Sequence, residues 1–135
     1  MRILLDTNAY SALRRGHDFV AAQIRQADEV LLSAVVAGEL LYGFRYGSRY
    51  QENVQELQRF LGEPNVRLLP VSLKTAEHFG RISAGLRTRG RPIPTNDVWI
   101  AAHTEEMGGF LISSDPHFNE VAGLSWLTFS AELRD

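Results

Sequence analysis

The sequence ILLDTNAY, residues 3–10, places three apolar residues directly before an acidic one. The run Arg2–Leu5 predicts a short buried strand, because strands covered on both faces read as continuous apolar runs. Asp6, followed by Thr7 and Asn8, then has two interpretations. It is either a turn residue, since Asp and Asn favour turns, or a carboxylate that the strand delivers to a site.

Short apolar runs alternate with longer amphipathic stretches along the rest of the chain. Ser33 and Ser72 are each suited to cap the helix that follows them. Pro70 predicts a strand that ends early or lies at a sheet edge, and RGRPIPTND, residues 89–97, is expected to be a loop. The expected strands are 2–5, 30–32, 66–71, 110–113 and 125–129, and the expected helices are 18–27, 34–42 or beyond, 49–61, 73–88 and 97–107.

Strands separated by helices predict βαβ units and a mainly parallel sheet with helices on both faces, which is an α/β fold. The length of 135 residues favours a single domain, 1–135. In open sheets of this kind, sites lie beyond the carboxyl ends of the strands. We therefore expect the chemistry of this chain at that edge of the sheet.

Composition excludes several classes of protein. The chain has no cysteine, so it has neither disulfides nor thiolate metal sites. No apolar run is long enough for a transmembrane helix or the core of a signal peptide, so we expect a cytoplasmic protein without a membrane. The net charge is −2, and 13 of the 14 basic residues are arginine. Arginine matches phosphate well, although codon bias in a GC-rich genome would give the same excess.

Four carboxylates are candidates for a site. Asp6 and Asp115 each follow an expected strand, so both point to the same edge of a parallel sheet. Glu39 and Asp97 lie on helix faces that are otherwise apolar, where acids are rarely buried without a partner or a metal. Each has an ordinary explanation on its own, such as a turn or a favourable helix dipole. Four of them at one edge are harder to explain in that way.

Carboxylates that converge without a cation raise one another's pKa, and a divalent metal removes that conflict. Oxygen ligands suit Mg²⁺ or Mn²⁺, and such a site indicates metal-assisted phosphodiester hydrolysis. The four histidines include no close pair at ligand spacing, so they do not compete with the acids for the site; His117, two residues after Asp115, is close to its edge in sequence but is not counted among the site residues. Nucleotide-binding glycine motifs and the GxSxG motif are absent from the sequence.

At these residues the chain resembles the PIN-domain ribonucleases, and most closely the VapC toxins of bacterial toxin–antitoxin pairs. The resemblance covers nearly the whole chain. It implies a Rossmann-like α/β/α sandwich, a Mg²⁺ or Mn²⁺ site, cleavage of single-stranded or loop RNA with tRNA as one candidate, homodimers, and inhibition by a VapB-like antitoxin. The segments that carry it are ILLDTNAY (3–10), SAVVAGELLYG (33–43), IPTNDVWIAAH (93–103) and GGFLISSDPHF (108–118).

Carried over residue by residue, the resemblance implies that the catalytic and metal-binding residues are Asp6, Glu39, Asp97 and Asp115. Thr7, Asn8 and Ser113 would supply supporting hydrogen bonds, with Ser113 where the family often has Thr. Two alternatives stay open. One is a PIN-domain nuclease in RNA processing that has no antitoxin, and the other is a non-catalytic RNA-binding module.

RNA binding also requires positive charge near the acidic centre. The arginines expected to contact phosphate follow Asp6 or precede Asp97 in the sequence, although solvated helix ends explain some of them equally well. The aromatic-rich stretch LLYGFRYGSRY, residues 40–50, can carry an antitoxin helix or part of a dimer face. The arginines are Arg14, Arg15, Arg81, Arg87, Arg89 and Arg91.

Overall fold

The computed structural model describes residues 1–130 of the chain. Five strands form one sheet in the order β3-β2-β1-β4-β5, and all neighbouring strands are parallel. The predicted α/β class is confirmed, and the described sheet is entirely rather than mainly parallel. The strands are β1 (Arg2–Leu5), β2 (Glu29–Ser33), β3 (Val66–Leu69), β4 (Phe110–Ser113) and β5 (Trp126–Thr128).

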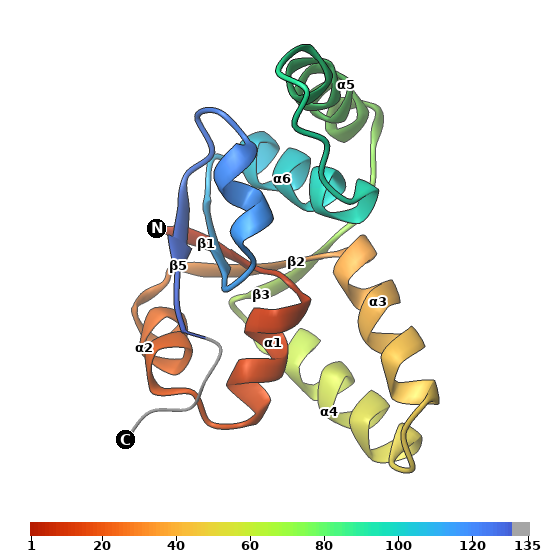
Figure 1. Cartoon of the computed structure of the whole chain (residues 1–135). Coiled ribbons are helices and arrows are strands. Elements are labelled where there is room, and N and C mark those ends of the chain that lie inside the picture. Colours follow the sequence, from red (N-terminus) through yellow and green to blue (C-terminus); the bar gives the residue numbers. More distant parts are fainter. Residues whose placement is uncertain (131–135) are drawn as a thin grey trace.

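Helices cover both faces of the sheet, as Figure 1 shows. In this view α1, α2 and α4 lie below the sheet, whereas α6 and the 3₁₀ helix η1 lie above it, and α5 packs against α6. None of the described helices is long and apolar enough to cross a membrane. The helices are α1 (Thr7–Arg14), α2 (Asp18–Gln26), α3 (Ala34–Arg45), α4 (Tyr50–Leu61), α5 (Leu73–Thr88), α6 (Thr95–Met107) and η1 (Pro116–Glu120).

The strand order places a reversal between β1 and β4. The chain runs outward from β1 to β2 and β3, then crosses back over the sheet to β4 and continues to β5. Right-handed crossovers in opposite directions put their helices on opposite faces of a sheet. The carboxyl ends of the two strands at such a reversal are where open α/β sheets bind ligands, so the segments that follow β1 and β4 are positioned for a site.

The core follows from the apolar runs of the central strands. Ile3, Leu31 and Ile112, one from each of three adjacent strands, are 0% exposed. Because helices lie on both faces, successive residues of these strands are buried irrespective of the face they point to. The sheet is therefore a rigid support for whatever its carboxyl ends carry.

Several local predictions are confirmed. Ser33 caps α3 by accepting a hydrogen bond from the amide of Val35, and Ser72 caps α5 in the same way from Thr75. The strand expected at 66–71 ends at Leu69 and lies at the sheet edge, as Pro70 indicated.

Other local predictions are wrong. No helix was expected directly after Asp6, yet α1 begins there, because Asp6 caps it. α6 begins at Thr95 rather than at Asp97, immediately after Pro94, whose fixed φ suits a helix start. No helix was expected between 113 and 125, yet the segment after Asp115 forms the 3₁₀ helix η1.

Candidate active site

Asp6 ends β1 and begins α1. Its Oδ1 accepts a hydrogen bond from the amide of Ala9 at 2.8 Å, and its Oδ2 accepts one from the hydroxyl of Ser113. The residue is only 4% exposed. Burial raises the pKa of Asp6 to about 6; the charges of Asp115 and Glu39 act in the same direction, whereas the two hydrogen bonds oppose it. Asp6 is thus a fixed carboxylate that is costly to ionise.

Ser113 links the ends of the two central strands. It is the last residue of β4 and is fully buried. Its hydroxyl donates to Asp6 and accepts a hydrogen bond from the backbone amide of Asp115 at 2.9 Å. The Ser113 side chain therefore orients the carboxylate of Asp6, which follows β1, and also holds the backbone of Asp115, which follows β4.

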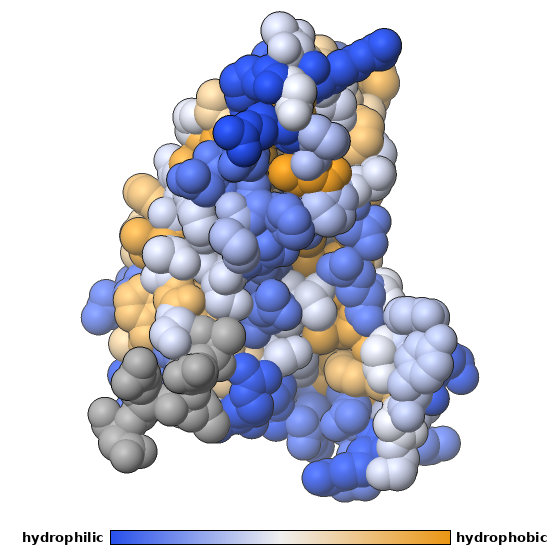
Figure 2. Space-filling view, in the orientation of Figure 1, coloured by the Kyte–Doolittle hydropathy of each residue, from blue (hydrophilic) through white to orange (hydrophobic). Residues whose placement is uncertain are grey.

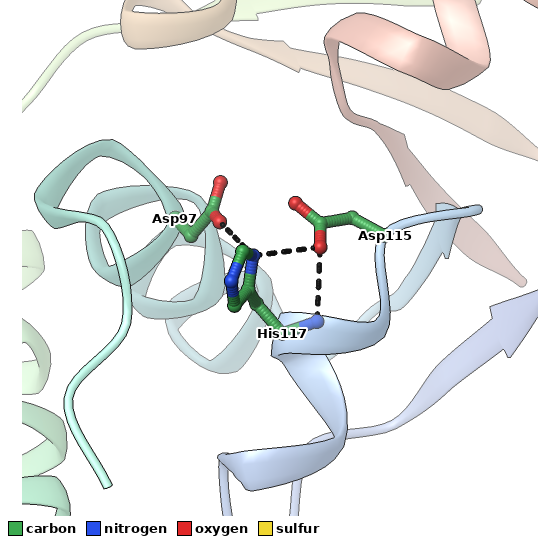
Figure 3. A group of neighbouring side chains, drawn as sticks. All are labelled: Asp97, Asp115 and His117. Carbon is green, nitrogen blue, oxygen red and sulfur yellow. Dashed lines mark hydrogen bonds and ion pairs between the residues drawn. The ribbon is translucent and has the colours of Figure 1, made fainter.

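Asp97, Asp115 and His117 face one another across the space between α6 and η1 (Figure 3). The Nδ1 atom of His117 lies 2.9 Å from Oδ1 of Asp115 and 3.6 Å from Oδ2 of Asp97. One ligand atom from each residue lies within 4.8 Å of the other two. Burial raises the pKa of Asp97 to about 7, and the Asp115 carboxyl adds to this, whereas His117 opposes it.

Glu39 connects the segment that carries Asp6 with the segment that carries Asp97. Its Oε1 accepts a hydrogen bond from the hydroxyl of Thr7 at 2.5 Å, and its Oε2 accepts one from the side-chain amide of Asn96 at 3.1 Å. Thr7 follows Asp6 and Asn96 precedes Asp97 in the chain. Both oxygens of this helical carboxylate are therefore oriented by residues adjacent to the other acids.

The four acids share one electrostatic environment. The carboxyls of Asp115 and Glu39 raise the pKa values of both Asp6 and Asp97. Within residues 1–130, His117 is the only basic side chain that pairs with any of the four. An oxygen-rich set of this kind fits Mg²⁺ or Mn²⁺, and a divalent cation would offset the repulsion that the burial of these groups creates.

The structure brings all four acidic candidates together, but only two of the three supporting candidates contact them. Thr7 and Ser113 each bond to one of the acids. Asn8 is exposed, and no hydrogen bond joins its side chain to the described part of the chain. Sequence reasoning missed Asn96 and gave His117 too little weight. The sequence did offer a signal for each: Asn96 is adjacent to Asp97, and His117 follows Asp115 by two residues.

The arginine candidates are engaged in contacts of their own. Arg14 pairs with Glu56 at 2.7 Å, and Arg81 with Glu105. Arg89 donates to the backbone carbonyl of Glu120 in η1, and Arg91 lies 4.0 Å from the carboxylate of the same residue. Arg89 and Arg91 therefore tie the start of the α5–α6 connection to the element that carries His117.

Arg87 differs from these arginines, because it is exposed and forms no ion pair with the residues that the structure describes. Arg15, the C-cap of α1, is likewise exposed. Arg81, by contrast, lines a pocket with Gly108, Gly109 and Phe110 at the amino end of β4, so it lies away from the acids.

A family model, the PIN domain, matches residues 3–124 of the chain. The chain belongs to the PIN-domain family. Ribonuclease VapC2 of Haemophilus influenzae is 31% identical to this PIN domain over 117 residues, which are 85% of this chain and 87% of that protein. The tRNA(fMet)-specific endonuclease VapC of Shigella flexneri is 29% identical, over 71% of this chain and 72% of that protein.

The fold of this PIN domain also matches a solved structure, VapBC-1 from nontypeable Haemophilus influenzae. The TM-score is 0.83 at 25% identity, and the match covers 95% of this chain and 98% of the other. The resemblance drawn from the four sequence segments is thereby confirmed. The family match begins in β1 and extends past η1, so it contains all four carboxylates.

Proposed function

We propose that this PIN domain is a divalent-metal-dependent endoribonuclease that hydrolyses phosphodiester bonds in single-stranded or loop regions of RNA. The observation that carries the proposal is the convergence of Asp6, Glu39, Asp97 and Asp115, with His117 as their only basic partner among the described residues. Similarity to proteins named VapC ribonucleases supports RNA as the substrate.

The four carboxylates are suited to hold Mg²⁺ or Mn²⁺. When bound, such a cation polarises the phosphoryl group and lowers the pKa of the attacking water. The chain keeps its carboxylates in place beforehand: Ser113 and the Ala9 amide orient Asp6, while Thr7 and Asn96 orient Glu39. Hydrogen bonds of this kind fix ligand orientation and tune affinity for metal. His117 can add one nitrogen to the oxygen ligands.

We further infer that the chain acts in the cytoplasm as the toxin of a toxin–antitoxin pair, as a homodimer held inactive by a VapB-like antitoxin. The likeness to the VapBC-1 structure supports this partner. The name of the Shigella flexneri relative makes tRNA the first substrate to test. Tyr42 of α3 and Tyr46, the residue that follows α3, are 63% and 78% exposed and offer apolar surface to the antitoxin or to the second subunit.

A nuclease assay tests the enzyme. The purified protein is incubated with an RNA panel that includes tRNA, with Mg²⁺, Mn²⁺ or EDTA. We expect cleavage with either metal, none with EDTA, and at least a roughly 100-fold slower reaction for Asp97→Asn, since metal catalysis contributes several kcal/mol. Glu77→Gln, which removes an exposed carboxylate on α5, is the control and should match the wild type. Cleavage that persists in EDTA would contradict the proposal.

A growth assay tests the toxin assignment separately. Expression of the wild-type chain in bacteria should arrest growth, and Asp97→Asn should not. Co-expression of the small protein encoded beside this chain should restore growth and copurify with it. Growth arrest that no neighbouring gene relieves would favour a PIN-domain nuclease without an antitoxin.

A further inference from the structure

The carboxylates of the acidic cluster fall into two groups by the donors that they meet. Both oxygens of Asp6 and both oxygens of Glu39 accept hydrogen bonds from other parts of the chain. Among residues 1–130, the carboxylates of Asp97 and Asp115 form hydrogen bonds and ion pairs only with one another and with His117. These two acids therefore keep lone pairs for a ligand, and the side chain that approaches both of them is an imidazole.

One ring nitrogen of His117 faces both aspartates (Figure 3). This Nδ1 atom lies 2.9 Å from Oδ1 of Asp115 and 3.6 Å from Oδ2 of Asp97, and one donor atom of each residue lies within 4.8 Å of the other two. Neighbouring ligands of an octahedral cation with bonds of about 2.1 Å lie about 3 Å apart, and opposite ligands lie about 4.2 Å apart. The three donor atoms therefore have the separations that ligands of one cation have.

The three side chains come from ordered elements and remain open to solvent. Asp97 lies in the first turn of α6, Asp115 caps η1, and His117 lies in η1. The side chains of Asp97, Asp115 and His117 are 14%, 21% and 51% exposed. Figure 2 shows mostly hydrophilic surface at the centre of the molecule, where η1 and α6 lie in Figure 1. A hydrated cation can therefore reach the three donors and keep water as its remaining ligands.

A nitrogen ligand distinguishes between divalent cations. Mg²⁺ is a hard cation that binds oxygen ligands and gives up its water reluctantly. Imidazole suits the first-row transition cations, and the affinity of a mixed site for them rises from Mn²⁺ to Co²⁺ and beyond. The oxygens of Asp97 and Asp115 serve both kinds of cation, whereas Nδ1 of His117 adds binding mainly for a transition cation.

We propose that His117 binds the cation directly through Nδ1, together with Asp97 and Asp115, and that this nitrogen makes the site select a first-row transition cation such as Mn²⁺ over Mg²⁺. Asp6 and Glu39, which are held by donors of the chain, add negative charge beside this N/O ligand set. The inference rests on the proposed metal-dependent function, of which it names the cation.

The first test compares the affinities for cations in the absence of RNA. MgCl₂, MnCl₂ and CoCl₂ are titrated calorimetrically into the metal-free wild type, and Mn²⁺ and Co²⁺ should bind at least about tenfold more tightly than Mg²⁺. His117→Ala should weaken the binding of Mn²⁺ and Co²⁺ roughly 10- to 100-fold and that of Mg²⁺ less than about twofold. His78→Ala removes a histidine that pairs with Glu105 instead, so it is the matched control and should keep all three affinities.

A second variant, His117→Asn, separates the ring nitrogen from the other roles of this side chain. The amide oxygen of asparagine can take the place of Nδ1 as a ligand. Mg²⁺ should therefore bind to His117→Asn as it does to the wild type, whereas the preference for Mn²⁺ and Co²⁺ should fall. Because half of the His117 side chain is exposed, both variants should fold, and melting without metal checks this.

The second test detects the bond between nitrogen and metal. The electron spin echo of Mn²⁺ bound to the wild type should carry the modulation that a directly coordinated nitrogen causes. His117→Ala and His117→Asn should lose this modulation, and His78→Ala should retain it. A residue that only supports the fold near the site would not produce this signal.

Two results would overturn the inference. One is bound Mn²⁺ whose spin echo lacks nitrogen modulation in the wild type. The other is a His117→Ala substitution that weakens the binding of Mg²⁺ and Mn²⁺ by the same factor, since His117 would then only orient Asp115. A wild type that gives the nitrogen signal but cuts no RNA would support the inference and contradict the ribonuclease function alone, because neither measurement uses RNA.

Discussion

Acidic residues have opposite electrostatic environments at the two ends of the central strands. At the amino ends, Glu29 pairs with Arg2 at 2.8 Å and lies 3.6 Å from Arg67, and Asp28 pairs with the amino group of Met1. That amino group holds the pKa of Asp28 below its usual value. At the carboxyl ends, burial raises the pKa values of Asp6 and Asp97 instead.

The difference separates acids that support the fold from acids that are held at a cost. The acids at the amino ends meet ordinary cations from the same chain. Those at the carboxyl ends, of which Asp6 is buried and the others half-buried, interact with one another, although the chain has 13 arginines that could have paired with them. Perturbed carboxylates that gather in this way are typical of functional sites, and the missing positive charge is what a metal ion would supply.

The largest expected effect is on RNA cleavage, when an acid at the carboxyl ends of the strands is replaced by its amide. The same exchange at the amino ends is the comparison. Asp6→Asn should slow RNA cleavage by roughly 10²- to 10⁴-fold, because several kcal/mol of metal catalysis is lost. Its metal-free melting temperature should stay level or rise, since Asn also caps helices and the buried charge is gone. Glu29→Gln should leave cleavage unchanged. Equal losses of activity in both variants, measured as kcat/KM, would remove the distinction between the two ends.

The next effect is the stabilisation by metal and its dependence on pH. Because the pKa values of Asp6 and Asp97 are raised in the folded protein, the metal-free fold is more stable when both carboxyls are protonated. This stability is lost as the pH rises through about 6 for Asp6 and about 7 for Asp97. Metal needs the ionised forms, so the increase in melting temperature with Mn²⁺ should be small near about pH 5 and largest above about pH 8. At 100 times Kd it should correspond to about 2.7 kcal/mol. Thermal melts measure it, and Asp97→Asn should abolish it.

A smaller effect concerns the arginines around the carboxyl end. Arg87→Ala and Arg91→Ala should each weaken RNA binding several-fold and lower the salt slope of the affinity by about 1. Arg25→Ala, at the end of α2, is the control on the opposite side of the sheet. Binding titrations over a range of salt concentrations measure both quantities. An unchanged slope would assign these arginines to the fold alone.

The smallest effect is expected at the amino ends. Glu29→Gln removes a partly exposed pair with Arg2, and such surface pairs contribute about 0–1 kcal/mol. Urea unfolding should therefore show a loss of at most that size, and the loss should shrink at high salt. A loss of several kcal/mol would mean that this end, too, depends on a specific charge arrangement.

Sequence reasoning found the strands and the acids because both leave local patterns. Apolar runs predicted β1, β2 and β4, and the placement of Glu39 among apolar residues indicated a site without any knowledge of the fold. α1 escaped because Asp is as typical of a turn as of a helix cap. His117 was not predicted as a site residue, because its contact with Asp97 depends on the η1 turn and on the packing of α6. The spacing of residues in the sequence reveals neither of these.

The pairing of β1 with β4 has a consequence for synthesis of the protein. The hydrogen bond from Ser113 to Asp6 joins residues 107 positions apart. The strand that carries Asp6 therefore lacks one of its two neighbours until β4 has left the ribosome, which takes on the order of ten seconds at usual rates of translation. The acidic centre cannot assemble on a nascent or truncated chain, so cleavage activity begins only when nearly the whole polypeptide has been made.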